Sequence, residues 1–210
     1  MGAQYLFISK DQGRNWTKIS PDLTTNDPSK LKQEESGGLS ADNTSAENHC
    51  TIFTISESPL DEKMICIGTD DGNIQMTPDA GINWYKLSDN FKNLNIPQQI
   101  WVSSIALSHF DKNTIYVTLD NHMYGDHNTY LMKTSDAGKS WEQIKNKEFT
   151  GFAHKIIEDP INKNLLFLGT EMGLFCSLDA GLSWFRMKNN FPEYALVRDI
   201  QIHPTQNALI

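Results

Sequence analysis

The chain has 210 residues, which is long enough to bury a sizeable core within one domain or within part of a larger one. Hydrophobic residues make up 39% and charged residues 21% of the chain, as is ordinary for a soluble globular protein. The formal net charge of −8 argues against nucleic acid as a partner, because an acidic surface repels phosphate groups. No long apolar run predicts a membrane span, and the N-terminus lacks the charged-then-apolar pattern of a signal peptide.

The cysteines and the first residues give two further expectations. Cys50, Cys66 and Cys176 each lie inside an apolar stretch. An odd number without a close pair indicates neither a disulfide framework nor a zinc site, so we expect buried thiols, no metal and no cofactor. At the N-terminus, Met1-Gly2-Ala3 runs directly into a strand-like stretch, which we interpret as the start of a piece of a longer chain.

One motif, Ser/Thr-x-Asp-x-Gly-x-x-Trp, recurs at residues 9–16, 77–84, 134–141 and 177–184, and we call these segments the motif hairpins. The carboxylate accepts hydrogen bonds from backbone N–H groups in a tight turn, the glycine tolerates positive φ, and the tryptophan begins the next strand with a large surface to bury. These positions therefore have structural roles: Asp11, Gly13, Trp16, Asp79, Gly81, Trp84, Asp136, Gly138, Trp141, Asp179, Gly181 and Trp184.

In chain order, residues 4–20 supply strands 3 and 4 of a first blade, and residues 21–48 form one long insertion rich in turn formers. Three whole blades follow, at about 50–88, 99–145 and 152–188. Each has two short strands that are joined by a Pro/Asp turn and lie ahead of a motif hairpin. Residues 196–210 supply only strands 1 and 2 of a last blade.

We therefore predict an all-β fold for residues 1–210, a single β-propeller region of four-stranded antiparallel blades with about four blades' worth of strands. The terminal half-blades leave two alternatives open. They pair and close a small ring, or the chain is a sector of a larger propeller whose open ends expose strand edges.

The motif hairpins, together with segments such as 19–26, 46–53 and 165–175, resemble the BNR/Asp-box β-propellers. That group includes sialidases, two-propeller xyloglucan hydrolases, the sortilin luminal domain and a photosystem assembly factor. The similarity covers essentially the whole chain and is closest to bacterial BNR-repeat or sortilin-like glycosyl hydrolase-like proteins of unassigned function. It implies a hairpin remote from any catalytic face, and a secreted or cell-envelope parent protein.

The sialidase pattern of three arginines around a carboxylate is missing from this sequence. Its only arginines are Arg14, Arg186 and Arg198, and the first two lie in or just after motif hairpins. Sialidase activity is therefore not expected of this chain alone.

Strand alternation predicts where a site lies. In an antiparallel blade the 2–3 loops and the 4–1 connections emerge at one end, opposite the motif hairpins, where the central channel opens. We expect ligand-binding residues there, since imidazoles, aromatic rings and a guanidinium suit a sugar: His49, Trp101, His122, His154 and Arg198. The same end carries the acids from which a glycoside-hydrolysing pair would come: Glu47, Asp70, Asp71, Asp126, Glu171 and Asp199.

Each candidate also has a structural explanation. Asp70 and Asp71 precede a glycine and suit a hairpin turn, while Glu47 to His49 suit a strand cap. The loop 122–127 has metal-type donors without ligand spacing. Trp101 is expected to pack between strands, and Arg198 to pair with its neighbouring acid.

Three functions remain open. The first is a non-catalytic binding module for a glycan or a protein partner. The second is a glycoside hydrolase, or part of one, with its acids on the channel face. The third is a sortilin-like peptide-binding propeller in which Arg198 meets a carboxylate.

Overall fold

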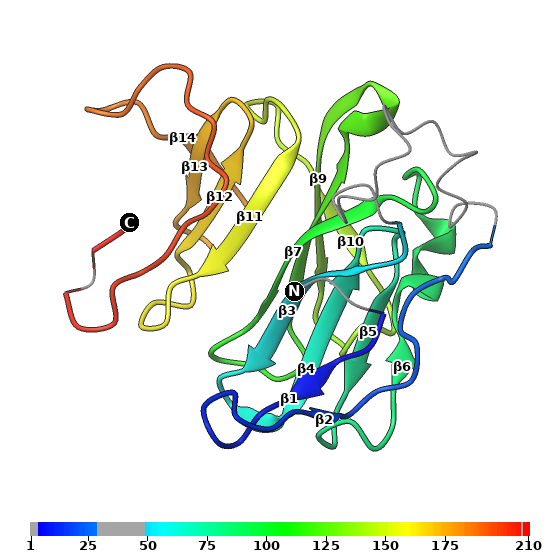
Figure 1. The fold of residues 1–210 in the computed structure, drawn as a ribbon. Coiled ribbons are helices and arrows are strands. Elements are labelled where there is room, and N and C mark those ends of the chain that lie inside the picture. Colours follow the sequence, from blue (N-terminus) through cyan, green and yellow to red (C-terminus); the bar gives the residue numbers. More distant parts are fainter. Residues whose placement is uncertain (1–3, 29–48, 207) are drawn as a thin grey trace.

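The structure is a computed structural model that describes residues 4–28, 49–206 and 208–210. These residues form three four-stranded antiparallel sheets and one two-stranded sheet (Figure 1). The predicted all-β architecture of four-stranded antiparallel blades is confirmed. No helix in the described part of the chain is long and apolar enough to cross a membrane.

Three complete blades follow one another along the chain, and in each the strands pair in sequence order. The first contains β3 (Ile52–Ser58), β4 (Asp61–Thr69), β5 (Ile74–Thr77) and β6 (Tyr85–Lys86). The second follows the 3-10 helix η1 (Ser88–Asn93) and contains β7 (Trp101–Leu107), β8 (Ile115–Asn121), η2 (His122–Tyr124), β9 (Asp126–Thr134) and β10 (Glu142–Ile144). The third contains β11 (Ala153–Glu158), β12 (Leu166–Thr170), β13 (Gly173–Ser177) and β14 (Phe185–Arg186).

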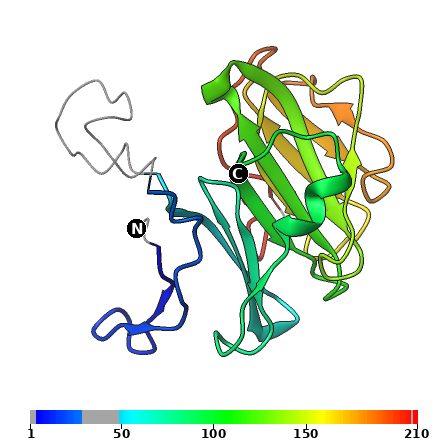
Figure 2. The same cartoon turned by 90° about the vertical axis from the view of Figure 1, so that its right-hand side faces the viewer.

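The first strands of the three blades lie side by side. Strand β7 packs against both β3 and β11, so these strands line one inner surface (Figure 1). The later strands of each blade lie progressively further from this surface. In the view turned by 90°, the third blade lies behind the second, and the first blade lies to the lower left of them (Figure 2).

The terminal half-blades do not pair with each other. Strand β1 (Phe7–Ile8) pairs with β2 (Thr17–Lys18), and this hairpin packs on the first blade through Leu6, Ile19 and Leu23. At the other end, Ile202 bridges only to Leu209, and the preceding segment hydrogen-bonds to the third blade. Within the described residues the chain is therefore an open row of blades (Figure 1), and the alternative of a small closed ring is not adopted.

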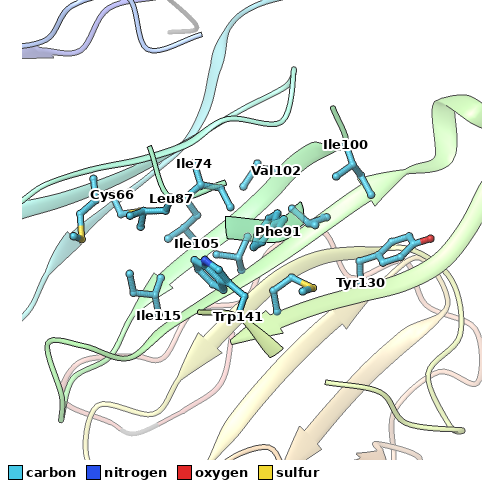
Figure 3. Packing of buried hydrophobic residues seen from close by; sticks show 14 of the residues in the cluster. Cys66, Ile74, Leu87, Phe91, Ile100, Val102, Ile105, Ile115, Tyr130 and Trp141 are labelled. Atoms are coloured by element: carbon cyan, nitrogen blue, oxygen red, sulfur yellow. The ribbon is translucent and has the colours of Figure 1, made fainter. Parts of the chain in front are cut away.

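The core is built between blades. One cluster joins the first and second blades, where Phe91 of η1 meets the Trp141 ring edge-on at 5.1 Å (Figure 3). A second cluster joins the second and third blades around Leu131 and Phe175. Burying each such aliphatic or aromatic side chain contributes about 1.5–3 kcal/mol. These layers hold the blades in register.

The cysteines are free thiols, and Cys66 lies in the layer between the first and second blades. Cys50 and Cys66 are buried and Cys176 is half-buried. Burial raises the pKa of Cys66 to about 12, so this thiol remains protonated at neutral pH.

The four motif hairpins share one hydrogen-bond pattern, shown here by the third. Asp136 accepts bonds from the Thr134 hydroxyl at 2.7 Å and from the backbone N–H of Ser140 at 2.9 Å. The Thr134 hydroxyl oxygen in turn accepts the N–H of Gly138 at 3.0 Å. The residue before each glycine also has positive φ, as Ala137 does at 59°, which the motif did not predict.

The motif tryptophans differ in burial although their hairpins match. Trp141 and Trp184 are 8% and 3% exposed, whereas Trp16 is 63% exposed. Each of the last three hairpins packs on the end of the preceding blade, as Gly81 does on Ile19. No described residue takes that place beside Trp16. The expected burial of this tryptophan is therefore wrong for the first hairpin.

Part of the insertion predicted at 21–48 lies outside the described residues. The described part, 21–28, runs along the first blade and is held there by Asp71. This carboxylate accepts the backbone N–H and the hydroxyl of Thr25, both at 2.7 Å.

Candidate functional site

A hollow of about 370 Å³ opens on the inner surface, at the end of the blades opposite the motif hairpins, and we call it the channel hollow. Its walls come from β3, β7, the end of β8 and β11, and from the segment that follows the third blade. Five of the predicted site residues line it: Trp101, His122, His154, Arg198 and Asp199.

A β-bulge in each innermost strand shapes this hollow. The register of β3 with β4 skips Phe53, that of β7 with β8 skips Ser103, and that of β11 with β12 skips His154. A bulge leaves one residue out of the ladder and re-aims its side chain. All three skipped residues line the channel hollow. The same local device thus brings three side chains from three blades to one place.

The fourth position of this series is Arg198. The sequence Val197-Arg198-Asp199-Ile200 aligns with Ala153-His154-Lys155-Ile156, so Arg198 corresponds to the bulged His154. Within the described residues no hydrogen bond or ion pair holds its guanidinium, and the side chain is exposed. The predicted pairing of Arg198 with Asp199 does not form, because Asp199 instead meets Lys155 at 3.0 Å.

Aromatic rings form one wall of the channel hollow. Phe53 meets Trp101 edge-on, with ring centroids 4.6 Å apart, and remains 54% exposed. The His122 ring stacks on Phe152 at 4.5 Å with the ring planes 16° apart. His154 approaches the same buried Phe152 at 4.8 Å. The hollow therefore offers flat apolar surface beside polar groups.

Two buried nitrogen atoms of this wall have no hydrogen-bond partner in the described part of the chain. They are the indole Nε1 of Trp101 and the imidazole Nε2 of His154. Burial lowers the pKa of His154 below its ordinary value of 6.5, so the ring is neutral at pH 7. An unpartnered buried polar atom costs about 1–3 kcal/mol, which a ligand atom can recover.

The carboxylates of the hollow are already engaged. Asp120 accepts the backbone N–H of His122 at 2.9 Å and lies 2.7 Å from the Nδ1 atom of that ring. Partial burial acts to raise the pKa of Asp199, but hydrogen bonds from Lys155 and Gln201 hold it below its ordinary value. Both acids therefore act here as fixed acceptors.

The other predicted acids lie outside the channel hollow. Asp71 is fully engaged with Thr25 and Thr69, which hold its pKa low although burial acts to raise it. Asp70 accepts the backbone N–H of Thr51 at 2.7 Å. Burial and the neighbouring Asp71 raise the pKa of Asp70.

The remaining candidates also lie apart from the hollow. Asp126 accepts bonds from Asn121, Asn128 and Tyr130 and organises the turn into β9. Glu171 approaches His127 at 3.3 Å. His49 is half-buried ahead of β3, and its Nε2 has no partner among the described residues. Glu47 lies outside the described residues.

Sequence reasoning missed Phe53, Asp120 and Lys155 as lining residues. A signal for Phe53 was present. When the first strands are aligned, an apolar residue precedes one position and an isoleucine stands two residues after it, while the position itself changes from phenylalanine to serine, histidine and arginine. Within the described ranges, no three His, Cys, Asp or Glu side chains are grouped to hold a metal ion.

No protein-family model matches the sequence, and no curated protein is a detectable match. Among solved structures, the chain is similar to an ancestral GH74 enzyme, with 15% identity and a TM-score of 0.61 over 88% of this chain and 21% of that one. It is similar to the GH74 xyloglucanase from Xanthomonas campestris, with 18% identity and a TM-score of 0.57 over 76% and 23% of the two chains. It also resembles YCF48 bound to D1 peptide, with 16% identity and a TM-score of 0.52 over 73% and 45%.

These likenesses are all below 25% identity, so they bear on the fold and not on the activity. The chain spans less than half the length of each of these three proteins. With the blade order and the inner strands described above, they identify the chain as a β-propeller.

Proposed function

We propose that this propeller region is a non-catalytic binding module whose ligand, a glycan, occupies the channel hollow. The observation that carries the proposal is the repeated bulge. Phe53, Ser103 and His154 leave the ladder at equivalent positions and all line one hollow, although their chemistry differs. The β-bulge repeats in each blade, but the side chain that it directs into the hollow differs. This arrangement suits recognition of a ligand whose surface is not symmetric.

The chemistry of the hollow favours a sugar. Phe53 and Trp101 offer ring surface on which the apolar face of a sugar ring packs. The Trp101 N–H, the His154 ring and the Arg198 guanidinium are polar groups without hydrogen-bond partners in the described chain, and hydroxyl oxygens would satisfy them. Largely apolar walls with a few convergent polar groups are typical of binding pockets.

The carboxylates give less support to hydrolysis. A glycoside hydrolase needs one acid with a raised pKa close to a second carboxylate. The acid whose pKa is raised, Asp70, lies outside the hollow, while Asp199 within it has a lowered pKa. The hydrolase therefore ranks below the binding module.

A second candidate rests on Arg198. Its exposed guanidinium has no carboxylate partner among the described residues and lies at the edge of the hollow. A guanidinium binds a carboxylate through two parallel hydrogen bonds. A protein segment with an acidic or C-terminal carboxylate is the corresponding ligand.

Binding can be tested by calorimetry against a panel of neutral and acidic glycans, with Trp101→Phe and Arg198→Gln as variants. Trp101→Phe keeps a ring but removes the N–H, so we expect a loss of affinity of about 2- to 10-fold, as for one hydrogen bond. Trp16→Phe, at the opposite end, is the matched control and should bind as the parent does.

The outcomes separate the candidates. Absence of binding to every glycan in the panel would overturn the glycan module. Binding of carboxylate-bearing peptides that is lost in Arg198→Gln would instead support the second candidate. Release of new reducing ends from any glycan would show an enzyme.

A further inference from the structure

We infer that the ligand is a glycan chain that extends from the channel hollow into a second, amide-lined hollow, rather than a single sugar. The inference rests on the proposed function and adds a subsite to it. The second hollow measures about 390 Å³, and we call it the amide hollow.

The amide hollow lies beside the second blade. Its walls come from the start of β9, from β10 and the segment after it, and from the connection that precedes β7. Four side-chain amides line it: Asn95, Asn128, Gln143 and Asn146. Within the described residues, no hydrogen bond holds the amides of Asn95 or Gln143. These two amides are available to a ligand.

One buried ring separates the two hollows. Phe152 is 7% exposed and stacks with His122, which lines the channel hollow. His154, on the channel side, also lies against this ring, and a third histidine, His127, lies 5.8 Å away between ring centroids and lines the amide hollow. His127 is exposed, with 59% of its side chain accessible. The two hollows are therefore neighbours on one face, within reach of one chain-like ligand.

The chemistry of the amide hollow indicates the class of this ligand. Each amide offers a donor and an acceptor, as each sugar hydroxyl does, and carries no charge. Besides the amides, Lys145 and the rings of Tyr130 and Phe149 line the amide hollow, and no acidic side chain does so in the described chain. Amides beside ring surface suit the hydroxyls and the apolar face of a sugar. We therefore expect an oligosaccharide in this hollow, and the neutral class is the one tested below.

The test compares oligosaccharides of increasing length against the intact chain. The probes are a ladder of neutral β-linked glucose oligomers and xyloglucan fragments from one to six backbone units, measured by calorimetry. We expect affinity to rise with length until both hollows are filled. The variants Asn95→Ala and Gln143→Ala should each lose about 2- to 10-fold for the long probes and nothing for the short ones.

Two further variants distinguish the absence of a second subsite from failure of the proposed function. Trp101→Phe should weaken short and long probes alike, because both occupy the channel hollow. Asn164→Ala, an exposed amide in the turn before β12, is the control and should change neither. If all probes bind equally at every length and Gln143→Ala is silent, the amide hollow is not a subsite. Preference for an extended peptide over every glycan would also overturn the inference.

Discussion

The two ends of the blades follow opposite rules. At the hairpin end, the same side chains make the same hydrogen bonds four times, and Asp11, Asp79, Asp136 and Asp179 each accept from a backbone N–H four residues later. At the channel end, equivalent backbone positions carry different side chains, and the nitrogen atoms of Trp101 and His154 lack partners in the described chain. Side chains that repeat from blade to blade therefore stabilise the fold. Side chains that vary at equivalent positions indicate where a ligand would bind.

Two of the motif tryptophans are exceptions at the hairpin end. The indole N–H groups of Trp16 and Trp184 donate to the carbonyl of their own hairpin glycine. That of Trp84 donates instead to the carbonyl of Ile19, and that of Trp141 is buried without a partner in the described chain. The packing of a motif tryptophan against the neighbouring blade thus changes the hydrogen bond that its indole makes. Four experiments test this contrast between the two ends of the blades.

The largest effect is expected from Trp184→Ala. This side chain is 3% exposed in the layer between the second and third blades, so its removal should lower the free energy of unfolding by about 3–5 kcal/mol. Trp16→Ala removes the same motif residue where it is 63% exposed and should cost less than about 1 kcal/mol. Urea unfolding measures both. Equal losses would show that the motif tryptophan acts within its hairpin and not between blades.

Gly81→Ala should follow. Gly81 has φ of 96°, and a Cβ there would lie 2.3 Å from the backbone oxygen of Ile19, so we expect a loss of about 2–4 kcal/mol in unfolding free energy. Gly125 in the channel-end loop has φ of 73°, and a Cβ there would meet nothing within 4 Å. Gly125→Ala is therefore the matched control, with about 1 kcal/mol of backbone strain alone. A loss at Gly81 no larger than this control would mean that the blades do not pack as described.

Trp101→Phe tests the channel end for stability. Removing an N–H that has no partner loses no hydrogen bond, so the free energy of unfolding should change by no more than about 1 kcal/mol while ligand affinity falls. Thermal unfolding and calorimetry on the same sample separate the two effects. A large loss of stability without a change in affinity would give Trp101 the packing role that its sequence context also allowed.

The smallest effect concerns acid. Hydrogen bonds from Ser140 and Thr134 lower the pKa of Asp136 from 3.8 to about 2. A depressed folded-state pKa means that the ionised carboxylate stabilises the fold above about pH 4, and that this contribution is lost as the pH falls toward 2. The melting temperature of Asp136→Asn should therefore lie below that of the parent at pH 7, and the two should approach each other near pH 2. A constant difference across this range would exclude ionisation as the cause.

The sequence alone predicts the fold and the location of several residues at the channel end. Four copies of an eight-residue motif and the strand patterns between them were sufficient for the all-β fold and the four-stranded blades, because the aspartate and the hydroxyl of each motif bond within their own turn. The same alternation placed Trp101, His122, His154 and Arg198 at the channel end, where they line one hollow.

Other features depend on contacts between strands and blades. The bulges that aim Phe53 and Ser103 into the hollow depend on how neighbouring strands register, and the burial of a motif tryptophan depends on the blade that precedes it. The partners of the acids are equally long-range, as Lys155 meets Asp199 and Thr25 meets Asp71. A repeat determines what lies within a blade, since its turns are local. Contacts between blades join residues far apart in the chain, so only the folded arrangement fixes them.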